Sequence, residues 1–261
     1  MPQRRILHDQ VHVWIKPPDI PGPDLHILRS VLDARELGKA GRFRFGIHRS
    51  RYITAHGFLR SVLAPYAGRS PEALEFGEAI HGKPYLVAEA TPEPVAFNMS
   101  HAEDLVVVAV TGNRRVGVDA EPIRAMKDGR LIAARWFSNN EQAILEASPP
   151  EERDRMFFRF WTRKEACAKG VGMGTSMNWQ AFDTSMRPDA SASQGSGNRW
   201  WLCDLFVPEG CAGAVAVEGG PSEVRYFTID RLPSRTSAEW EWKESLPGTA
   251  TRMESMELNL P

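Results

Sequence analysis

The sequence has few cysteines and almost no net charge, and both features exclude classes of protein. Its three cysteines, Cys167, Cys203 and Cys211, are an odd number without CxxC spacing, which favours neither a disulfide framework nor a zinc site. A formal net charge of −1 indicates no general attraction to nucleic acid or to a membrane surface. Reduced thiols are typical of the cytoplasm, so we expect a cytoplasmic protein that binds neither.

Long apolar runs and the commonest catalytic motifs are also missing. The first residues, MPQRRILHDQVHVW, lack the continuous apolar core of a signal peptide. The longest uninterrupted apolar run covers residues 105–110, far too short to cross a bilayer. The sequence contains no P-loop, GxGxxG, HExxH or GxSxG motif. If a nucleotide binds here, side chains without those motifs must hold its phosphates.

The composition is that of an ordinary globular protein, with 42% apolar and 25% charged residues. A length of 261 residues suits one large domain or two small ones. Apolar residues recur at helical spacing over residues 49–66, and Gly68 follows as a plausible C-cap. A second helical pattern covers residues 30–45, and short strands are predicted at residues 11–15 and 82–86.

Two segments in the middle of the chain are predicted to pair as strands. FNMSH at residues 97–101 leads into the apolar run at 105–110, and TGN at 111–113 marks a turn. RVGVDAE at residues 115–121 follows that turn. We therefore expect residues 105–110 and 115–121 to form a hairpin, or part of an antiparallel meander.

The second part of the chain has a similar pattern. Ser138 is a good N-cap and Glu141 follows three residues later, which predicts a capping box in the helix over residues 137–147. A longer helix is predicted over residues 154–169, where a glycine-rich stretch ends it. Two strands are predicted after it, in RWWLCDLFV and CAGAVAVEG.

These patterns predict two halves and a tail. Each half holds one long helix and a few strands, although no residue-level repeat is visible, so a duplicated architecture is a hypothesis. We expect an N-terminal half over residues 1–113, a C-terminal half over residues 114–232, and a partly ordered tail over residues 233–261. The small, polar residues 183–198 indicate an exposed loop or insertion.

Asp119 and Glu121 are two residues apart in a predicted strand. Alternate residues of a strand point to the same face, so both carboxylates project together just before Pro122. Such a pair suits Mg²⁺, which takes one or two carboxylates and completes its shell with water and phosphate oxygens. DxE is a common pattern, however, and the ordinary alternative is a solvated strand end.

FRFWTRKEACAKG, residues 158–170, places Glu165 one helical turn before Lys169. In this order the two side chains make a favourable surface ion pair worth a few tenths of a kcal/mol, which is the simpler interpretation. Trp161 lies one turn earlier on the same face, and charges on a partly buried face are unfavourable unless they are used. The alternative hypothesis is that Glu165 and Lys169 face a substrate together.

Three further polar residues have both an ordinary and a functional interpretation. His101, after Ser100 in NMSH, is predicted at a sheet edge, where ligand contacts are common, although a lone histidine is more often structural. Arg51 opens the first long helix, where its charge opposes the helix dipole. It makes a salt bridge there or clamps a phosphate. Lys83, in the GKP turn, reaches either a phosphate or water.

Taken together, these segments resemble one family. NMSH, GVDAE, FSNNE and FWTRKEACAKGVGMG occur in the order and at the spacing of the 4′-phosphopantetheinyl transferases of the surfactin-synthetase-activating type. In that family GVDxE and WxxKEAxxK form a diagnostic pair, and here the second follows the first after about 40 residues. The resemblance covers roughly residues 35–180 and leaves out the insertion and the far C-terminus.

The resemblance implies a fold and an activity. The fold is α+β, with two similar halves, each a small antiparallel sheet packed with a long helix, and an active site in the cleft between them. The activity transfers the 4′-phosphopantetheine arm of coenzyme A to a serine of an apo acyl or peptidyl carrier protein. It depends on Mg²⁺, releases adenosine 3′,5′-bisphosphate, serves secondary-metabolite synthases among others, and is carried out by a monomer.

The family's site residues can be carried over to matching positions. Asp119, Glu121 and Glu165 would hold Mg²⁺ against the pyrophosphate of coenzyme A. Glu165 or a metal-bound water would take the proton of the serine, and Lys169 would neutralise the departing phosphate. Glu36 occupies a position where some members of the family carry a basic residue. The residues that would contact coenzyme A are Arg51, Lys83, Pro84, Ser100, His101 and Lys39.

Three other interpretations compete with this one. Transferases dedicated to one fatty-acid synthase carrier are short, trimeric, single-half proteins, whereas GVDAE lies mid-chain here. A binding module that has lost catalysis is disfavoured because all three candidate carboxylates and Lys169 are present. A purely structural α+β domain would require the motifs to co-occur by accident.

Carrier proteins present their serine on an acidic helix, so a basic docking patch is expected on the enzyme. Basic residues crowd one region of the sequence and are candidates for that patch, although they could equally be solvated loop residues. These residues are Arg114, Arg115, Arg124, Lys127, Arg130 and Arg135.

Overall fold

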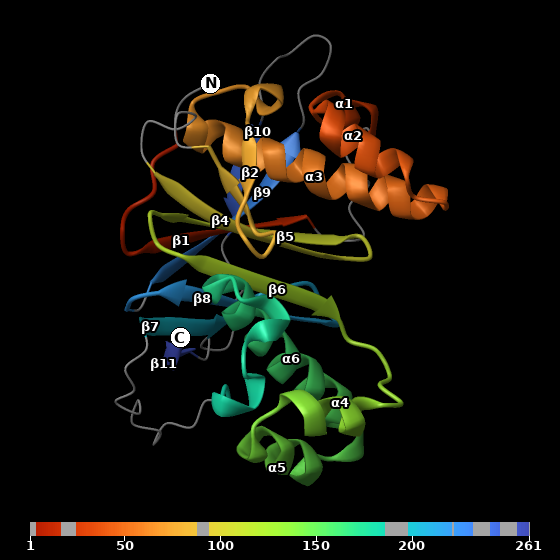
Figure 1. Cartoon of the computed structure of the whole chain (residues 1–261), viewed down its shortest axis with the longest axis vertical. Coiled ribbons are helices and arrows are strands. Elements are labelled where there is room, and N and C mark those ends of the chain that lie inside the picture. The colour runs from red at the N-terminus through yellow and green to blue at the C-terminus, as the bar shows by residue number, and fades with distance from the viewer. Residues whose placement is uncertain are drawn as a thin grey trace.

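The computed structural model describes residues 4–16, 25–87, 94–185, 198–220, 222–231, 241–245 and 255–260. Four layers follow one another in this part of the chain: helices, a sheet, a second sheet and helices again (Figure 1). Each sheet is therefore covered by helices on its outer face and by the other sheet on its inner face. The α+β class and the two similar halves expected from the sequence are confirmed.

The first sheet has the strand order β10-β9-β1-β5-β4. Helix α3, Gly46–Ala67, covers it and ends at Gly68, whose φ of 62° is the left-handed conformation of a C-cap. The helix expected over residues 49–66 is thereby confirmed. The strands of this sheet are β1 (Gln10–Lys16), β4 (Val95–Ala102), β5 (Leu105–Gly112), β9 (Glu223–Arg231) and β10 (Glu241–Ser245), and a separate hairpin is formed by β2 (Phe76–Glu78) and β3 (Pro84–Leu86).

Asp33 interrupts the helix expected over residues 30–45. Its carboxylate accepts a hydrogen bond from the Glu36 amide at 2.8 Å, and the Glu36 carboxylate accepts one from the Asp33 amide at 3.0 Å. This capping box begins α2, Ala34–Gly41, after α1, Leu25–Ser30, has ended. The prediction of one helix was wrong because α1 and α2 both pack on α3, so apolar spacing continues across the break.

The second sheet has the strand order β11-β7-β8-β6 and is antiparallel throughout. Helix α6, Arg153–Val171, covers its outer face and ends at Gly172, with a φ of 83°. The expected capping box between Ser138 and Glu141 is present at the start of α5. The remaining elements of this half are β6 (Val116–Pro122), α4 (Gly129–Trp136), α5 (Asn139–Ala147), β7 (Asn198–Asp204), β8 (Cys211–Glu218) and β11 (Ser255–Leu260).

Strand β6 does not pair with β5, so the hairpin expected from residues 105–110 and 115–121 was wrong. β5 pairs with β4 and β1, whereas β6 pairs with β8 in the other sheet. The chain crosses between the sheets at the turn expected at residues 111–113, where Asn113 has a φ of 52°. A tight turn followed by an apolar segment is compatible with both arrangements, because β6 is buried on both faces.

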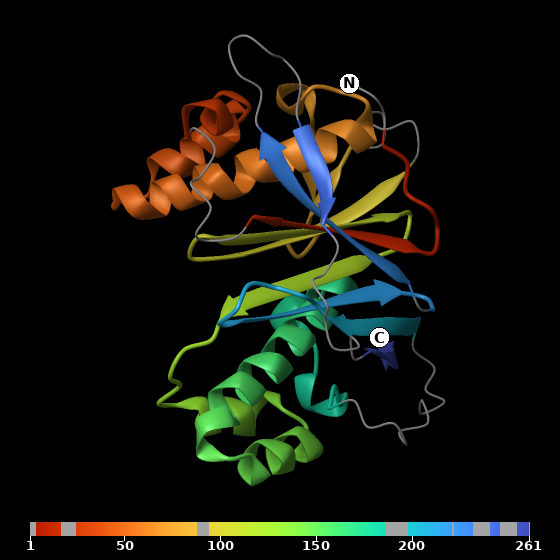
Figure 2. The same cartoon turned by 180° about the vertical axis from the view of Figure 1, so that it is seen from behind.

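The C-terminal part of the chain returns to the first half. Strand β9 lies parallel to β1, and β10 lies antiparallel to β9 at the far edge of the first sheet (Figure 2). Strand β9 therefore departs from the expected C-terminal half over residues 114–232. The tail over residues 233–261 contributes β10 and β11, whereas residues 186–197 of the expected insertion lie outside the described residues.

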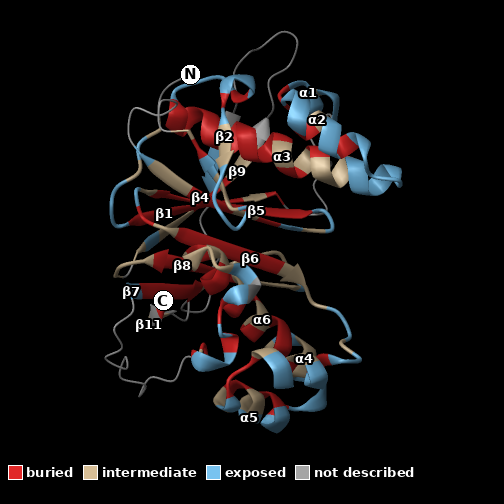
Figure 3. Ribbon diagram, in the orientation of Figure 1, coloured by how far each residue is buried: buried red, intermediate tan, exposed pale blue. Residues whose placement is uncertain are grey.

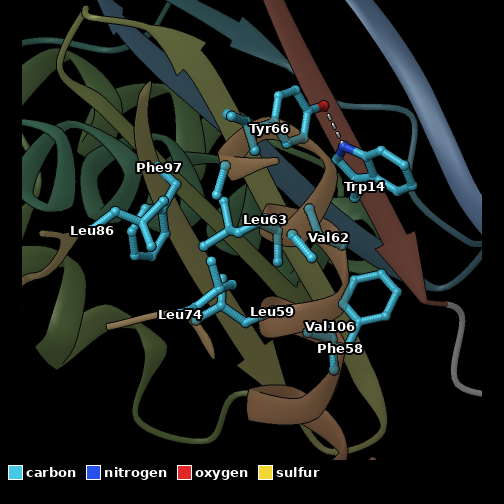
Figure 4. Close-up of a cluster of buried hydrophobic side chains, with 14 of the residues drawn as sticks. Trp14, Phe58, Leu59, Val62, Leu63, Tyr66, Leu74, Leu86, Phe97 and Val106 are labelled. Atoms are coloured by element: carbon cyan, nitrogen blue, oxygen red, sulfur yellow. Dashed lines mark hydrogen bonds between the residues drawn. The ribbon is translucent and has the colours of Figure 1, made fainter. Parts of the chain in front are cut away.

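Burial explains why β5 is apolar without alternation. Val106, Val108 and Val110 face the core beneath α3, whereas Leu105, Val107 and Ala109 face the core between the two sheets. Figure 3 shows that β5 and most of β6 are buried, whereas β4 also carries intermediate and exposed residues. In the first core, Leu59 and Leu63 of α3 pack against Leu74, Leu86 and Phe97, and the Trp14 indole donates to the Tyr66 hydroxyl at 2.9 Å (Figure 4).

Candidate active site

The two halves meet where the edge strands β4 and β6 lie against each other. β4 is the last strand of the first sheet and β6 is the last strand of the second, which confirms the sheet-edge position expected for His101. Side chains join the two strands, since the Asn98 Oδ1 accepts from the Val118 amide at 2.9 Å and the Ser100 Oγ donates to Asp119 Oδ1 at 2.8 Å. Polar groups of both halves therefore converge here.

Asp119 is at the centre of this convergence and is 3% exposed. Its Oδ1 accepts from the Lys169 Nζ at 2.6 Å, and Lys169 also donates to the Ser100 Oγ at 3.2 Å. The other oxygen, Oδ2, is buried, and no donor among the described residues reaches it. Since buried carboxylate oxygens are costly without a partner, this orphaned acceptor marks a place for a ligand.

Two further carboxylates surround Asp119. Burial, followed by the negative charge of Asp119, raises the pKa of Glu165 to about 6, and Glu121 contributes less. Burial and Asp119 also raise the pKa of Glu121, which pairs with Arg124 at 3.2 Å. The three acidic residues predicted as metal ligands thus share one electrostatic environment, in which bringing negative charges together is unfavourable.

Lys169 is not in the surface ion pair that was the simpler interpretation. It lies on α6 and contacts Asp119 of β6, so the helix turns its charged face toward the junction. Trp161 is stacked on Phe157, with ring centroids 6.1 Å apart, and contacts Trp179. Trp161 therefore packs within the helical layer, whereas Glu165 and Lys169 face the neighbouring strand.

No three His, Cys, Asp or Glu side chains within the described ranges are arranged to hold a metal ion as they stand. Lys169 occupies one oxygen of Asp119, and Arg124 contacts Glu121. The donor set nevertheless suits a hard cation, because it consists of carboxylate oxygens and includes the buried Asp119 Oδ2. A cation would also offset both the burial and the repulsion by Asp119 that raise the pKa of Glu165.

A small cleft lies beside this junction, between α2, α3 and the β2–β3 hairpin, with a volume of about 100 Å³. Two of the predicted coenzyme A contacts line it, Lys39 and Pro84. Lys39 lies 3.5 Å from Glu78, which also pairs with Arg35 at 2.6 Å. The rim of the cleft therefore carries both signs of charge, with two exposed cations held beside the exposed Glu78 carboxylate.

Glu36 is buried at the inner wall of this cleft. Its carboxylate accepts from the Arg60 Nε at 2.7 Å and contacts the His56 Nδ1 at 3.3 Å. Burial favours the neutral acid, but the hydrogen bonds from His56, Asp33 and Arg60 outweigh it and lower the pKa of Glu36. Glu36 is therefore a structural anion that holds α2 on α3.

Arg51 and His101 lie at the same end of the first half. The Arg51 guanidinium donates to both Asp104 oxygens, at 3.1 and 3.4 Å, at the turn after β4. His101 is an exposed residue near the end of β4. Its pKa is lowered by partial desolvation and then by the positive charges of His56 and Lys169. Both side chains are accessible, and their contacts with coenzyme A stay a prediction.

Lys83 was expected to contact a phosphate of coenzyme A, and its side chain reaches backbone carbonyls of the second half. Its Nζ donates to three backbone carbonyls, those of Lys169 at 2.7 Å, Val116 at 2.8 Å and Gly170 at 3.2 Å. Burial, and then the positive charge of Arg115, lower the pKa of Lys83 to about 8. The expected phosphate contact stays a prediction, and this geometry offers a different role.

Sequence reasoning missed a buried ion pair that orders the second half. Lys164 and Glu141 have fully buried side chains 3.0 Å apart. Lys164 also donates to the carbonyls of Trp179 and Phe182, and Glu141 accepts from the amide and hydroxyl of Thr184. The capping-box pattern revealed only the local role of Glu141. A lysine in the middle of a helix gave no sign that it would be buried.

The six residues of the expected basic patch lie at opposite ends of β6. Arg114 and Arg115 precede β6, whereas the other four basic residues follow it, so the prediction that all six form one patch was wrong. Arg114 is 7% exposed and donates to the carbonyls of Glu218, His8 and Gly220, and Arg115 pairs with Glu218. Lys127 and Arg130 instead line a cavity of about 260 Å³ between α4, α5 and α6.

Comparison with known proteins identifies both halves. Residues 22–113 match the family model described as the N-terminal part of 4′-phosphopantetheinyl transferases, and residues 115–207 match that of the 4′-phosphopantetheinyl transferase superfamily. Helices long and apolar enough to cross a membrane are absent from the described residues.

Curated relatives extend the match over most of the chain. The 4′-phosphopantetheinyl transferase HetI of Nostoc sp. is 35% identical over 218 residues, which cover 84% of this chain and 92% of the relative. The 4′-phosphopantetheinyl transferase of Bacillus subtilis is 30% identical over 167 residues, 64% of this chain and 71% of the relative. AcpT of Salmonella typhimurium is 34% identical over 149 residues, 57% of this chain and 72% of the relative.

Proposed function

Because this chain belongs to the 4′-phosphopantetheinyl transferase superfamily, we propose that it transfers the 4′-phosphopantetheine arm of coenzyme A to a serine of an apo carrier protein. The second product is adenosine 3′,5′-bisphosphate. A cytoplasmic location and a monomeric state are part of the proposal.

One observation carries the proposal at the level of residues. A buried aspartate from β6, a lysine and a glutamate from α6, and a serine from β4 meet at the junction of the two halves, and Asp119 keeps one buried oxygen without a donor among the described residues. Three carboxylates repel an anionic ligand, so such a ligand binds here only together with a cation. Asp119, Glu121 and Glu165 would hold that cation, Mg²⁺, which neutralises pyrophosphate charge when bound.

In the proposed reaction, the serine oxygen of the carrier attacks the phosphorus that bears the pantetheine. The bond from this phosphorus to the bridging oxygen breaks, and the 5′-phosphate of adenosine 3′,5′-bisphosphate leaves. Glu165 accepts the serine proton, and the ammonium of Lys169 lies where charge develops on the leaving phosphate. Two of its three N–H groups contact Asp119 and Ser100, which leaves one to donate to that phosphate.

The nucleotide end of coenzyme A is proposed to lie along the cleft of the first half. Lys39 and Pro84 line this cleft, and Arg51 and His101 lie toward the junction. Arg51 would exchange Asp104 for the 3′-phosphate, a change that keeps a planar, bidentate arrangement. Ser100, which bridges Lys169 and Asp119, would contact the nucleotide from the opposite side.

The carrier is proposed to dock on the basic residues that follow β6. Arg124 is exposed and Arg130 and Lys127 line the cavity between α4, α5 and α6, which also has apolar walls formed by Met126 and Leu145. Charge complementarity with an acidic helix would steer the carrier, and the apolar wall would accept a side chain from it. Arg135, on α4, belongs to the same proposed surface.

The test of the activity weighs carrier proteins after incubation. The purified protein is mixed with coenzyme A, Mg²⁺ and two apo carriers, one acyl and one peptidyl. A mass gain of one phosphopantetheine arm that disappears with EDTA is the expected result. Gain on one carrier would indicate a dedicated enzyme. Coenzyme A binding without gain on either carrier would contradict the proposal and favour a binding module that has lost its chemistry.

The docking surface has its own test. Arg130→Glu should raise the KM for the carrier and leave the Kd of coenzyme A unchanged, because Arg130 lies away from the coenzyme A cleft. Arg69→Glu, an exposed charge reversal at the end of α3, is the matched control. An unchanged carrier KM in Arg130→Glu, at low ionic strength where surface charges act most strongly, would remove Arg130 from the docking surface.

A further inference from the structure

The β2–β3 hairpin belongs to the first half in sequence, but Lys83 at its turn reaches into the second half. The turn is tight, because the Ala79 amide donates to the Lys83 carbonyl at 2.9 Å and Gly82, with a φ of 78°, donates to Ala79 at 2.8 Å. This geometry fixes the backbone of Lys83 and directs its side chain away from the hairpin. Its ammonium then lies between α6 and β6.

The three acceptors of this ammonium come from two elements of the second half. The carbonyls of Lys169 and Gly170 lie in the last turn of α6, where carbonyl groups lack intrahelical partners, and the third belongs to Val116, the first residue of β6. A cation is favourable at a helix C-terminus because it complements the dipole. Lys83 therefore caps a helix of the other half.

Close approach of α6 and β6 makes this triple contact possible. A Cβ on Gly117 would lie 2.0 Å from the Ala166 carbonyl oxygen and 2.2 Å from the Gly170 nitrogen. Only glycine fits between the two backbones, so carbonyls of strand and helix come within reach of one ammonium. The same two elements carry Asp119 and Lys169, whose side chains meet at 2.6 Å.

The other side of the hairpin belongs to the coenzyme A cleft. Phe76, Gly77, Glu78 and Pro84 line that cleft, and Glu78 pairs with Arg35 and Lys39 of α2. One short hairpin is thus joined to the cleft wall at one end and to the end of α6 at the other. A shift of the hairpin would move the cleft and the Lys169 backbone together.

We propose that Lys83 is a positioning residue, which fastens the hairpin of the coenzyme A cleft to α6 and β6 and so holds Lys169 and Asp119 in register with the bound pyrophosphate. It is not a phosphate ligand in this proposal, which rests on the proposed function. Phosphoryl transfer depends on alignment, so loss of the fastening reduces turnover more than it reduces binding of coenzyme A.

Two substitutions separate positioning from phosphate binding. Lys83→Met removes the ammonium and keeps the length of the side chain. Lys83→Arg keeps the positive charge, and arginine is an excellent phosphate ligand, but its planar fork cannot direct three donors from one atom to three carbonyls. Lys243→Met, which removes an exposed lysine from β10, is the matched control for loss of one charge.

Steady-state kinetics with a saturating carrier give kcat, and calorimetry without carrier gives the Kd of coenzyme A. Both Lys83 variants should lower kcat, by up to about 10²-fold for a misplacement of about 1 Å, with a Kd within about threefold of wild type. A Kd weakened more than kcat in Lys83→Met, together with recovery in Lys83→Arg, would overturn the proposal in favour of phosphate binding. Normal kinetics in both variants would also overturn it.

A second measurement tests the fastening without any reaction. Amide hydrogen exchange of the ligand-free protein should be faster in Lys83→Met than in wild type at residues 166–172 and 82–86, and unchanged in Lys243→Met. Equal exchange in Lys83→Met and wild type would show that Lys83 fastens nothing. Failure of the wild-type protein to modify any carrier would instead contradict the proposed function, and the exchange result would still stand.

Discussion

Replacement of Gly117 by alanine should both destabilise the protein and reduce its activity. The new Cβ would meet two backbone atoms of α6, the Ala166 oxygen at 2.0 Å and the Gly170 nitrogen at 2.2 Å. Neither atom belongs to a side chain that could rotate away, so α6 must move by about 1 Å or more to restore a tolerable separation. Overpacking of this kind costs about 1–3 kcal/mol and occasionally more.

The same displacement acts on the candidate active site. Lys169 and Asp119 lie on the two elements that the new methyl group separates, and their 2.6 Å contact depends on the close approach. A shift of about 1 Å in such a constellation can reduce turnover about 10²-fold. Gly117→Ala should therefore lose more activity than its remaining folded fraction explains.

Urea unfolding measures the free energy of unfolding. The carrier mass assay measures turnover without urea, at a temperature where the variant is folded. Gly38→Ala is the control, because Gly38 lies inside α2 with nothing within 4 Å of its would-be Cβ. It should stabilise the protein by about 0.5–1 kcal/mol, as alanine does in helix interiors. Wild-type stability and turnover in Gly117→Ala would refute the close-packing argument.

Three other predictions concern the charged groups. Asp119→Asn and Glu165→Gln should each abolish transfer in the mass assay with little change in circular dichroism, and normal turnover by either would remove it from the metal site. Lys164→Met should lower the free energy of unfolding by about 3–5 kcal/mol, because it leaves Glu141 buried without its cation, and the double variant Lys164→Met/Glu141→Leu should recover part of that loss in urea titrations. Burial and nearby cations lower the pKa of His12 from 6.5 to about 3. The unfolded chain therefore binds the extra proton first, and stability should fall as pH drops below about 6.5, at up to about 1.4 kcal/mol per pH unit. Urea unfolding at pH 7, 6 and 5 should show a weaker pH dependence in His12→Gln, and equal slopes would contradict this assignment.

Local patterns were enough to place most elements of this chain. Capping residues and apolar spacing located α3, α5 and α6, because Gly68, Ser138 and the glycines after Lys169 act on their own backbone or on the next turn. The pairing of strands was harder to predict from local patterns. A turn at residues 111–113 is needed both for a hairpin and for a crossing to another sheet, so the partner of β6 could not be inferred from it.

For the candidate site, sequence patterns identified the residues but not their contacts. The order of the motifs pointed to the superfamily, which the comparisons established, and it singled out Asp119, Glu165 and Lys169 as one set. Their assigned roles stay predictions. That Lys169 meets Asp119 and Ser100, rather than forming a surface pair with Glu165, depended on the packing of α6 against β6.

The sequence by itself therefore determined α3, α5 and α6 with their ends, the two-part organisation and the identity of the candidate site residues, because each depends on neighbours within a turn or on a short motif. The tertiary structure alone decided which sheet β6 joins, that Arg114 and Lys164 are buried, and that Lys83 meets the end of α6. Those outcomes depend on groups far apart along the chain, and a side chain's burial and hydrogen-bond partners are set only when the two halves pack together.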